Sequence, residues 1–175
     1  MTMRSLLFLL LLLSGIARAY DFEDGSIDIP EGFEGPITQH MGQGVSSTAY
    51  SYPHGESGGT LLQITTWNPG QEFPKMSKEE LKAGSEQYLL QFLGGIERKR
   101  ESFERGQVEF IEASGHPLAK ISWKGSAMGK SVHGVMYCFI FNSKIYSFHT
   151  QDFDSFNKKY TNLAVKAFES MQLKR

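Results

Sequence analysis

Gly55-Glu56-Ser57-Gly58-Gly59 matches the G-x-S-x-G pattern that surrounds the nucleophilic serine of many hydrolases. In those enzymes a strand precedes the serine and a helix follows it, which exposes the hydroxyl at a sharp turn. Here the flanking residues have the apolar, β-branched pattern of strands on both sides. The chain also contains 18 glycines, so chance matches are easy. We interpret the segment as a hairpin turn.

The sequence GSAMGKS at 125–131 resembles a phosphate-binding loop with one residue missing. That motif needs four residues between its glycines, and three are present here. Its phosphate cradle also depends on the N-terminus of a following helix, whereas this segment links two predicted strands. We interpret it as a second turn.

Histidine is the commonest metal-binding side chain, and the chain has five: His40, His54, His116, His133 and His149. None has a ligand spacing such as H-E-x-x-H. If the turn at 142–143 is tight, His149 lies roughly opposite Tyr137, and His133 lies farther along the neighbouring strand. A metal would then need a third ligand from an unspecified place. We predict no metal and no cofactor.

An aromatic, proline-stiffened loop follows the strand that ends near Trp67, and it includes Phe73. Large aromatic side chains in a stiff loop can anchor a protein partner at low entropic cost. We therefore name Trp67 and Phe73, with His54 and Glu56 of the neighbouring turn, as candidate partner-binding residues. The alternative is that Trp67 points into the core while Phe73 packs on the start of the next helix.

Cys138 is the only cysteine, so the chain cannot form an internal disulfide. It lies in the apolar run VMYCFIF, which is typical of a central strand. A free cysteine in such a run behaves as a small hydrophobic residue. We predict a buried structural role and not a catalytic thiol.

Strands are predicted from the apolar and β-branched runs between breakers. Before the first helix, strands are predicted at 26–29 and 61–67. Between them, residues 37–40 and 47–52 form either one bent strand or two separate strands. After the first helix, a four-strand meander covers 107–113, 118–124, 131–141 and 144–151. The last two strands are apolar on both faces, so we expect this meander to be covered on both sides, at least in part.

Two amphipathic helices are predicted. Ser77 and Glu80 have the spacing of a capping box at the start of the first, whose apolar stripe runs from Leu81 to Ile96. The charged run 97–105 is interpreted as a solvated helical continuation, with a docking surface as the alternative. The second helix spans about 155–173, with Asp154 as its N-cap. Asp152 and Asp154 lack the further ligands of a calcium loop, so capping explains them better.

Hairpin-spaced strands form antiparallel sheets, because parallel neighbours need longer crossovers. The predicted fold is therefore α+β: one domain, residues 20–175, with a twisted antiparallel sheet of about six to seven strands and two amphipathic helices packed on it.

Residues 1–19 have the pattern of a cleavable signal peptide. Arg4 precedes an apolar run from Leu6 to Leu13, and an A-x-A site ends at Ala19. The run is shorter than the roughly 20 apolar residues of a bilayer span. We predict export to the periplasm or the medium, without a stable membrane anchor after cleavage.

The predicted mature chain has a small net negative charge. Removal of Arg4 and Arg18 leaves 16 basic residues against 19 acidic ones, and both signs are interspersed. Without a basic patch, nucleic acid is not an expected partner. We expect a monomer that binds an envelope or extracellular protein.

At the level of element order, the sequence resembles the extrinsic PsbP subunit of photosystem II and the periplasmic DcrB-like proteins, which share an α/β/α sandwich. The resemblance rests on the turn Pro30-Glu31-Gly32-Phe33, the helix at 81–93, the meander and the closing AFESMQL at 167–173. It implies a non-enzymatic accessory or binding protein attached to a larger assembly. It supplies no site motif, and the cysteine of DcrB-like lipoproteins is missing at the cleavage site.

The resulting hypothesis is an exported, non-catalytic binding or accessory protein of the cell envelope that acts through protein–protein contacts, for example as an inhibitor or immunity protein. One alternative is a small-ligand or lipid binder with a cavity between sheet and helix. Another is a small hydrolase in which histidines and carboxylates converge without a motif. A ligand site or an active site requires a concave pocket. A partner site requires an exposed apolar patch.

Overall fold

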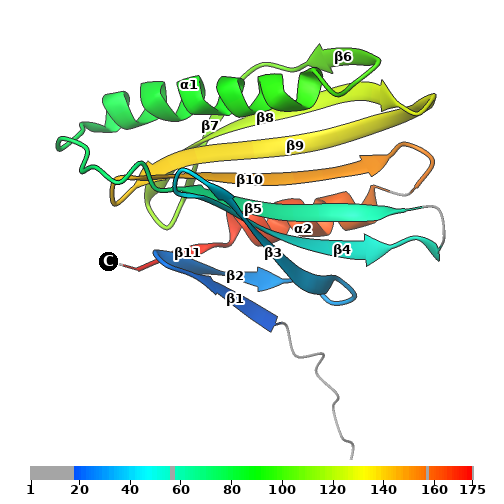
Figure 1. Ribbon diagram of the computed structural model, residues 1–175, viewed down its shortest axis with the longest axis horizontal. Coiled ribbons are helices and arrows are strands. Elements are labelled where there is room, and N and C mark those ends of the chain that lie inside the picture. The colour runs from blue at the N-terminus through cyan, green and yellow to red at the C-terminus, as the bar shows by residue number, and fades with distance from the viewer. Residues whose placement is uncertain (1–17, 56–57, 157, 175) are drawn as a thin grey trace, which may run out of the picture.

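The computed structural model describes residues 18–55, 58–156 and 158–174. Eight strands form the main sheet, and all of their described pairings are antiparallel. Seven follow one another in the order β3 (Glu34–Gly42), β4 (Val45–Pro53), β5 (Gly59–Trp67), β10 (Lys144–Phe153), β9 (Lys130–Phe141), β8 (His116–Ala127) and β6 (Ser102–Arg105). The eighth, β7 (Glu109–Ala113), also pairs with β8. The predicted α+β class and antiparallel sheet are confirmed (Figure 1).

A second, smaller sheet contains β1 (Arg18–Phe22), β2 (Gly25–Ile29) and β11 (Gln172–Leu173). The sequence predicted β2 but not its two partners. Residues 1–17 of the predicted signal peptide lie outside the described residues. Cleavage before Tyr20 would leave three residues of β1, Tyr20 to Phe22, to pair with β2.

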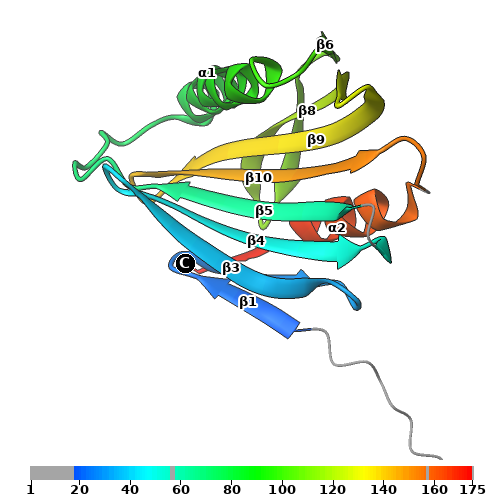
Figure 2. The same ribbon diagram turned by 45° about the vertical axis from the view of Figure 1, so that its right-hand side comes forward.

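Two helices pack on opposite faces of the main sheet: α1 (Lys78–Glu97) and α2 (Lys159–Glu169) (Figures 1 and 2). The predicted capping box of α1 is confirmed, because the Ser77 hydroxyl accepts from the Glu80 amide while the Glu80 carboxylate accepts from the Ser77 amide. None of the helices in the described ranges is both long enough and apolar enough to cross a membrane.

Two predictions about the helix ends are wrong. The charged run 97–105 does not continue α1, because the helix ends at Glu97 and residues 102–105 form β6. The second helix begins four residues later than predicted, with Lys158 as its N-cap. Asp154 does not cap it, because its carboxylate lies 2.6 Å from Nδ1 of His133 instead.

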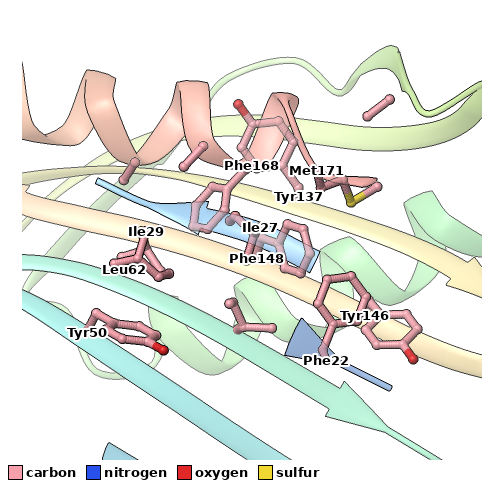
Figure 3. Close-up of a cluster of buried hydrophobic side chains, with 14 of the residues drawn as sticks. Phe22, Ile27, Ile29, Tyr50, Leu62, Tyr137, Tyr146, Phe148, Phe168 and Met171 are labelled. Carbon is pink, nitrogen blue, oxygen red and sulfur yellow. The ribbon is translucent and has the colours of Figure 1, made fainter. Parts of the chain in front are cut away.

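Each face of the main sheet has its own hydrophobic core. On one face the small sheet and α2 cover an aromatic cluster that includes Phe22, Tyr146, Phe148 and Phe168 (Figure 3). On the other face, Leu89 and Leu93 of α1 pack against apolar side chains of β8, β9 and β10. The meander is therefore covered on both sides, as its sequence predicted.

The turn between β9 and β10 sets the register of the sheet's centre. Asn142 and Ser143 have φ angles of 47° and 58°, which is the conformation of a two-residue type I′ hairpin. His149 consequently pairs with Met136 and not with Tyr137, one position away from the prediction. Because side chains alternate along a strand, His149 lies on the face that α1 covers.

Candidate functional site: a groove beside α1

The last turns of α1 form one wall of a groove on the main sheet. The helix packs mainly on β8 and β9. The same face of the sheet continues past the helix across β5 and β4 (Figure 2). The space between the helix and these strands is a groove of about 630 Å³. We refer to it as the α1 groove. Its size lies within the roughly 300–1,000 Å³ of small-molecule sites.

The floor of the α1 groove is set by the pairing of β5 with β10. In register, Leu61 faces Gln151, Gln63 faces His149 and Thr65 faces Ser147. Met136 of β9 lies beside His149 and extends the floor toward α1. The floor is thus mostly polar, an unusual composition for a sheet face next to a hydrophobic core.

The wall and the rim have different chemistry. Phe92 and Ile96 of α1 form an apolar wall, and Gly95 between them also lines the groove. Met41 and Val45, at the turn between β3 and β4, line the opposite side. The segment that leaves α1 adds three consecutive cations to the rim, Arg98, Lys99 and Arg100. No acidic residue lines the groove among the residues that the structure describes.

Arg100 is held in a fixed position at the groove. Its guanidinium lies over the ring of Trp123, with Cζ 5.3 Å from the ring centroid, and one NH₂ group donates to Oε1 of Gln151 at 2.6 Å. Its Nε is buried without a hydrogen-bond partner, and no ion pair in the described ranges involves it. Burial lowers the pKa of Arg100, since desolvation disfavours its charged form.

His149 is more deeply buried than Arg100 and contacts the same tryptophan, Trp123. Its ring stacks on Trp123 with 5.9 Å between centroids and 26° between planes. The residue is only 6% exposed, and its Nε2 is buried without a hydrogen-bond partner. Burial, and then the charge of Arg100, lower the pKa of His149 to about 3. The imidazole is therefore neutral at physiological pH and offers one unused donor or acceptor.

Trp67 and Phe73 pack against the second core. Trp67 meets Tyr88 edge to face with 5.7 Å between ring centroids, and the Phe73 amide donates to the Ser143 hydroxyl at 2.8 Å. Both side chains are half-buried, in agreement with the alternative that the sequence left open. Their role in binding a partner stays a prediction.

His54 is close to none of these aromatic residues, because it follows β4 at the opposite end of the β4–β5 hairpin from Trp67. Its Nε2 lies 3.0 Å from both the Thr60 hydroxyl and the Asp152 carboxylate, and its ring stacks on Phe156. Glu56, the fourth predicted residue, lies outside the described residues. The structure therefore does not bring Trp67, Phe73 and His54 together.

The polar cluster around Asp152 has its hydrogen bonds satisfied. Asp152 accepts from Thr60 at 2.5 Å as well as contacting His54, and the side chains of His54 and Asp152 are 9% and 1% exposed. His133 is similarly placed between Asp154 and Thr161. The described residues contain no group of three potential metal ligands. These contacts connect the end of the main sheet to the segment before α2.

Arg100 and His149 are the two groove residues whose roles the sequence did not reveal. Arg100 lies in the charged run interpreted as a solvated continuation of the helix or a docking surface, and His149 is one of the histidines considered for a metal site or for a site without a motif. The available local signal is the charged run itself, which begins at Glu97, the last residue of α1. No local pattern indicates that Arg100 of this run contacts Gln151, 51 residues later in the sequence.

Comparison with solved structures places the chain in a PsbP-like fold. The cyanobacterial PsbP of Synechocystis sp. PCC 6803 (CyanoP) superposes with a TM-score of 0.62 at 12% identity, covering 92% of this chain and 95% of that one. LpqN of Mycobacterium tuberculosis, described as involved in cell envelope biogenesis, gives a TM-score of 0.57 at 10% identity, covering 85% and 82%. PA94 of Pseudomonas aeruginosa, a protein of unknown function, gives 0.53 at 10% identity, covering 90% and 96%.

No protein family and no curated protein sequence matches the chain. At these identities the three structures show the fold alone. The predicted resemblance to PsbP-like proteins is therefore confirmed as a resemblance of fold.

Proposed function

We propose that this protein is an exported, non-catalytic accessory protein of the cell envelope, and that it works by binding a small molecule in the α1 groove. The observation that carries the proposal is the pair of buried polar atoms at the groove, Nε of Arg100 and Nε2 of His149, that have no partner. A buried polar group without a hydrogen bond costs about 1–3 kcal/mol, and more where the group is charged. A ligand that supplies these hydrogen bonds recovers that energy.

Binding fits the arrangement better than catalysis does. An active site needs an accessible acid, base or nucleophile next to the space for substrate. The closest match to such a pair, His54 with Asp152, is buried and already hydrogen-bonded to Thr60. The thiol of Cys138 is fully buried, and burial raises its pKa.

Export and an envelope location are supported by the N-terminal pattern of residues 1–19 and by the fold. LpqN, one of the structurally similar proteins, is described as involved in cell envelope biogenesis. An accessory protein that binds an envelope compound is consistent with both.

Action through protein–protein contacts, including that of an inhibitor or immunity protein, is the second candidate. It is favoured by β3, an edge strand of the main sheet in which every residue is exposed. Ile37 and Met41 are 67% and 57% exposed there. An uncovered edge strand can pair with a strand of another chain.

One experiment separates the two candidates. The tagged protein is expressed in its native host, recovered from the envelope fraction and examined by native mass spectrometry. We expect a bound small molecule in the wild type and in Gly94→Leu, but not in Gly95→Leu, because only Gly95 lines the groove. A protein partner that is lost in Ile37→Lys, without any small molecule in the wild type, would instead establish the second candidate.

A further inference from the structure

We propose that the ligand of the α1 groove is an amphipathic anion, with its carboxylate or phosphate at Arg100 and its apolar part along Phe92 and Ile96. This inference rests on the proposed binding function and specifies the chemical class of the ligand. It is carried by three features of the groove: its charge, its polar floor and its apolar wall.

The charge of the groove is positive and locally unbalanced. Arg98, Lys99 and Arg100 lie on the rim, and no carboxylate among the described residues lines the groove. Glu101 is next in the chain, but its carboxylate accepts the Gly129 amide at 3.1 and 3.2 Å and is thereby directed elsewhere. A partly buried cation without a counter-ion favours an anionic ligand.

Arg100 is already oriented for this contact. The cation–π contact with Trp123 and the hydrogen bond to Gln151 hold its guanidinium in place. A planar guanidinium donates two parallel hydrogen bonds to a carboxylate or a phosphate, and the loss of side-chain entropy is small when its position is fixed beforehand. Arg100 is therefore suited to hold the anionic group.

The polar floor supplies further hydrogen bonds. His149 is neutral, so its Nε2–H tautomer can donate to an oxygen of the ligand without any change of charge. Gln63 lies directly opposite His149 on the paired strand, and its amide nitrogen donates one hydrogen to Ser47 at 2.7 Å, which leaves its second N–H to donate to the ligand. A purely hydrocarbon ligand would leave His149 buried and unpaired.

The apolar wall requires a ligand with a hydrophobic part. Phe92 and Ile96 of the wall, and Leu61 and Met136 of the floor, all line the groove. Methionine adapts its shape to irregular apolar ligands because its side chain is unbranched and flexible. A small inorganic anion would leave this wall in contact with water, whereas a chain or ring would cover it.

The test uses five probes and measures their binding by isothermal titration calorimetry, with each dodecyl compound kept below its critical micelle concentration. Dodecyl phosphate and dodecanoate carry an anion on a chain, dodecyltrimethylammonium carries a cation, dodecyl maltoside is neutral, and inorganic phosphate has no chain. We expect the two chain anions to bind at least about tenfold more tightly than each of the other three.

Arg100→Gln should weaken the binding of dodecyl phosphate by about tenfold or more and leave the affinity for dodecyl maltoside unchanged. Arg105→Gln, which changes an exposed cation of β6 outside the groove, should leave both unchanged. Arg100→Lys should weaken dodecyl phosphate to an intermediate extent, since it keeps the charge and loses the planar group. Circular dichroism and thermal melting establish that each variant is folded.

Several outcomes would overturn the inference. If dodecyltrimethylammonium binds as tightly as the two chain anions, the argument from charge is wrong. If inorganic phosphate binds as tightly as they do, the argument from the apolar wall is wrong. Unchanged binding in Arg100→Gln removes the assigned anion site. If no probe binds although native mass spectrometry finds a neutral ligand that is lost in Gly95→Leu, the proposed binding function stands and the ligand class is wrong.

Discussion

The carboxylate of Asp24 accepts a 2.5 Å hydrogen bond from the hydroxyl of Tyr146, and so joins the turn of the small sheet to the centre of the main sheet. Asn142 and Lys144 donate to the same carboxylate at 2.9 and 3.0 Å. Burial alone would raise the pKa of Asp24, but these three donors outweigh it, and its pKa is lowered. The small sheet is therefore held on the main sheet by a charged contact as well as by the aromatic core.

Removal of this carboxylate should destabilise the fold strongly. We expect Asp24→Ala to lower the free energy of unfolding by about 2–4 kcal/mol, because Tyr146 and Lys144 lose a buried charged partner. Urea unfolding followed by circular dichroism measures the change. Asp28→Ala, an exposed position of β2, is the matched control and should change stability by less than about 0.5 kcal/mol. Equal effects of the two substitutions would contradict a specific role for Asp24.

Substitution by alanine should change the stability of the protein in opposite directions at two glycines. A Cβ at Gly134 would lie 2.5 Å from two ring atoms of Trp123 and 2.7 Å from the Thr150 carbonyl oxygen. Gly134→Ala should therefore destabilise the protein by about 1–3 kcal/mol through overpacking. Gly94 lies within α1, and a Cβ there has only an ordinary contact at 3.7 Å with Arg98. Gly94→Ala should stabilise by about 0.5–1 kcal/mol, because alanine favours the helix.

Thermal denaturation of both variants beside the wild type measures these shifts. Gly134→Ala should also displace the ring of Trp123 relative to Arg100, which the fluorescence of the folded protein would report. A Gly134→Ala protein that melts at or above the wild-type temperature would show that the ring of Trp123 has room to move.

Local patterns predicted the parts of the fold that local physics determines. The hairpin spacing identified the antiparallel sheet, and Ser77 with Glu80 correctly marked the start of α1. β6 was missed because Ser102–Arg105 carries three polar residues and becomes a strand only by pairing with β8. The α1 groove could not be predicted, because it depends on the contact of Arg100 with Gln151 of β10, which is 51 residues away in the sequence.

The thiol of Cys138 should be unreactive in the folded protein. It is fully buried in β9, and burial raises the pKa of its thiol, so almost no thiolate forms near neutral pH. We expect no labelling by a maleimide under native conditions and complete labelling in 6 M guanidinium, as measured by intact mass. Rapid native labelling would show that this strand opens readily, contrary to a well-packed core.

The depressed pKa of His149 should make stability depend on pH. In the unfolded chain a histidine titrates near 6.5, whereas in the folded protein the pKa of His149 is about 3. Between these values the unfolded state binds a proton that the folded state does not. Stability contributed by the neutral ring is therefore fully present above about pH 6.5 and declines on acidification, by up to about 1.4 kcal/mol per pH unit.

His149→Gln removes this dependence, so the stability difference between wild type and variant should shrink steadily from pH 7 to pH 4.5. His116 contributes in the same direction, because burial lowers its pKa too, so His116→Gln is measured in parallel. The lowered pKa of Asp24 acts only below about pH 4, outside this window. Chemical unfolding at four pH values decides the matter. Parallel curves for wild type and His149→Gln would mean that the ring next to Trp123 already reaches solvent, which would remove the basis for an unpaired buried nitrogen in the groove.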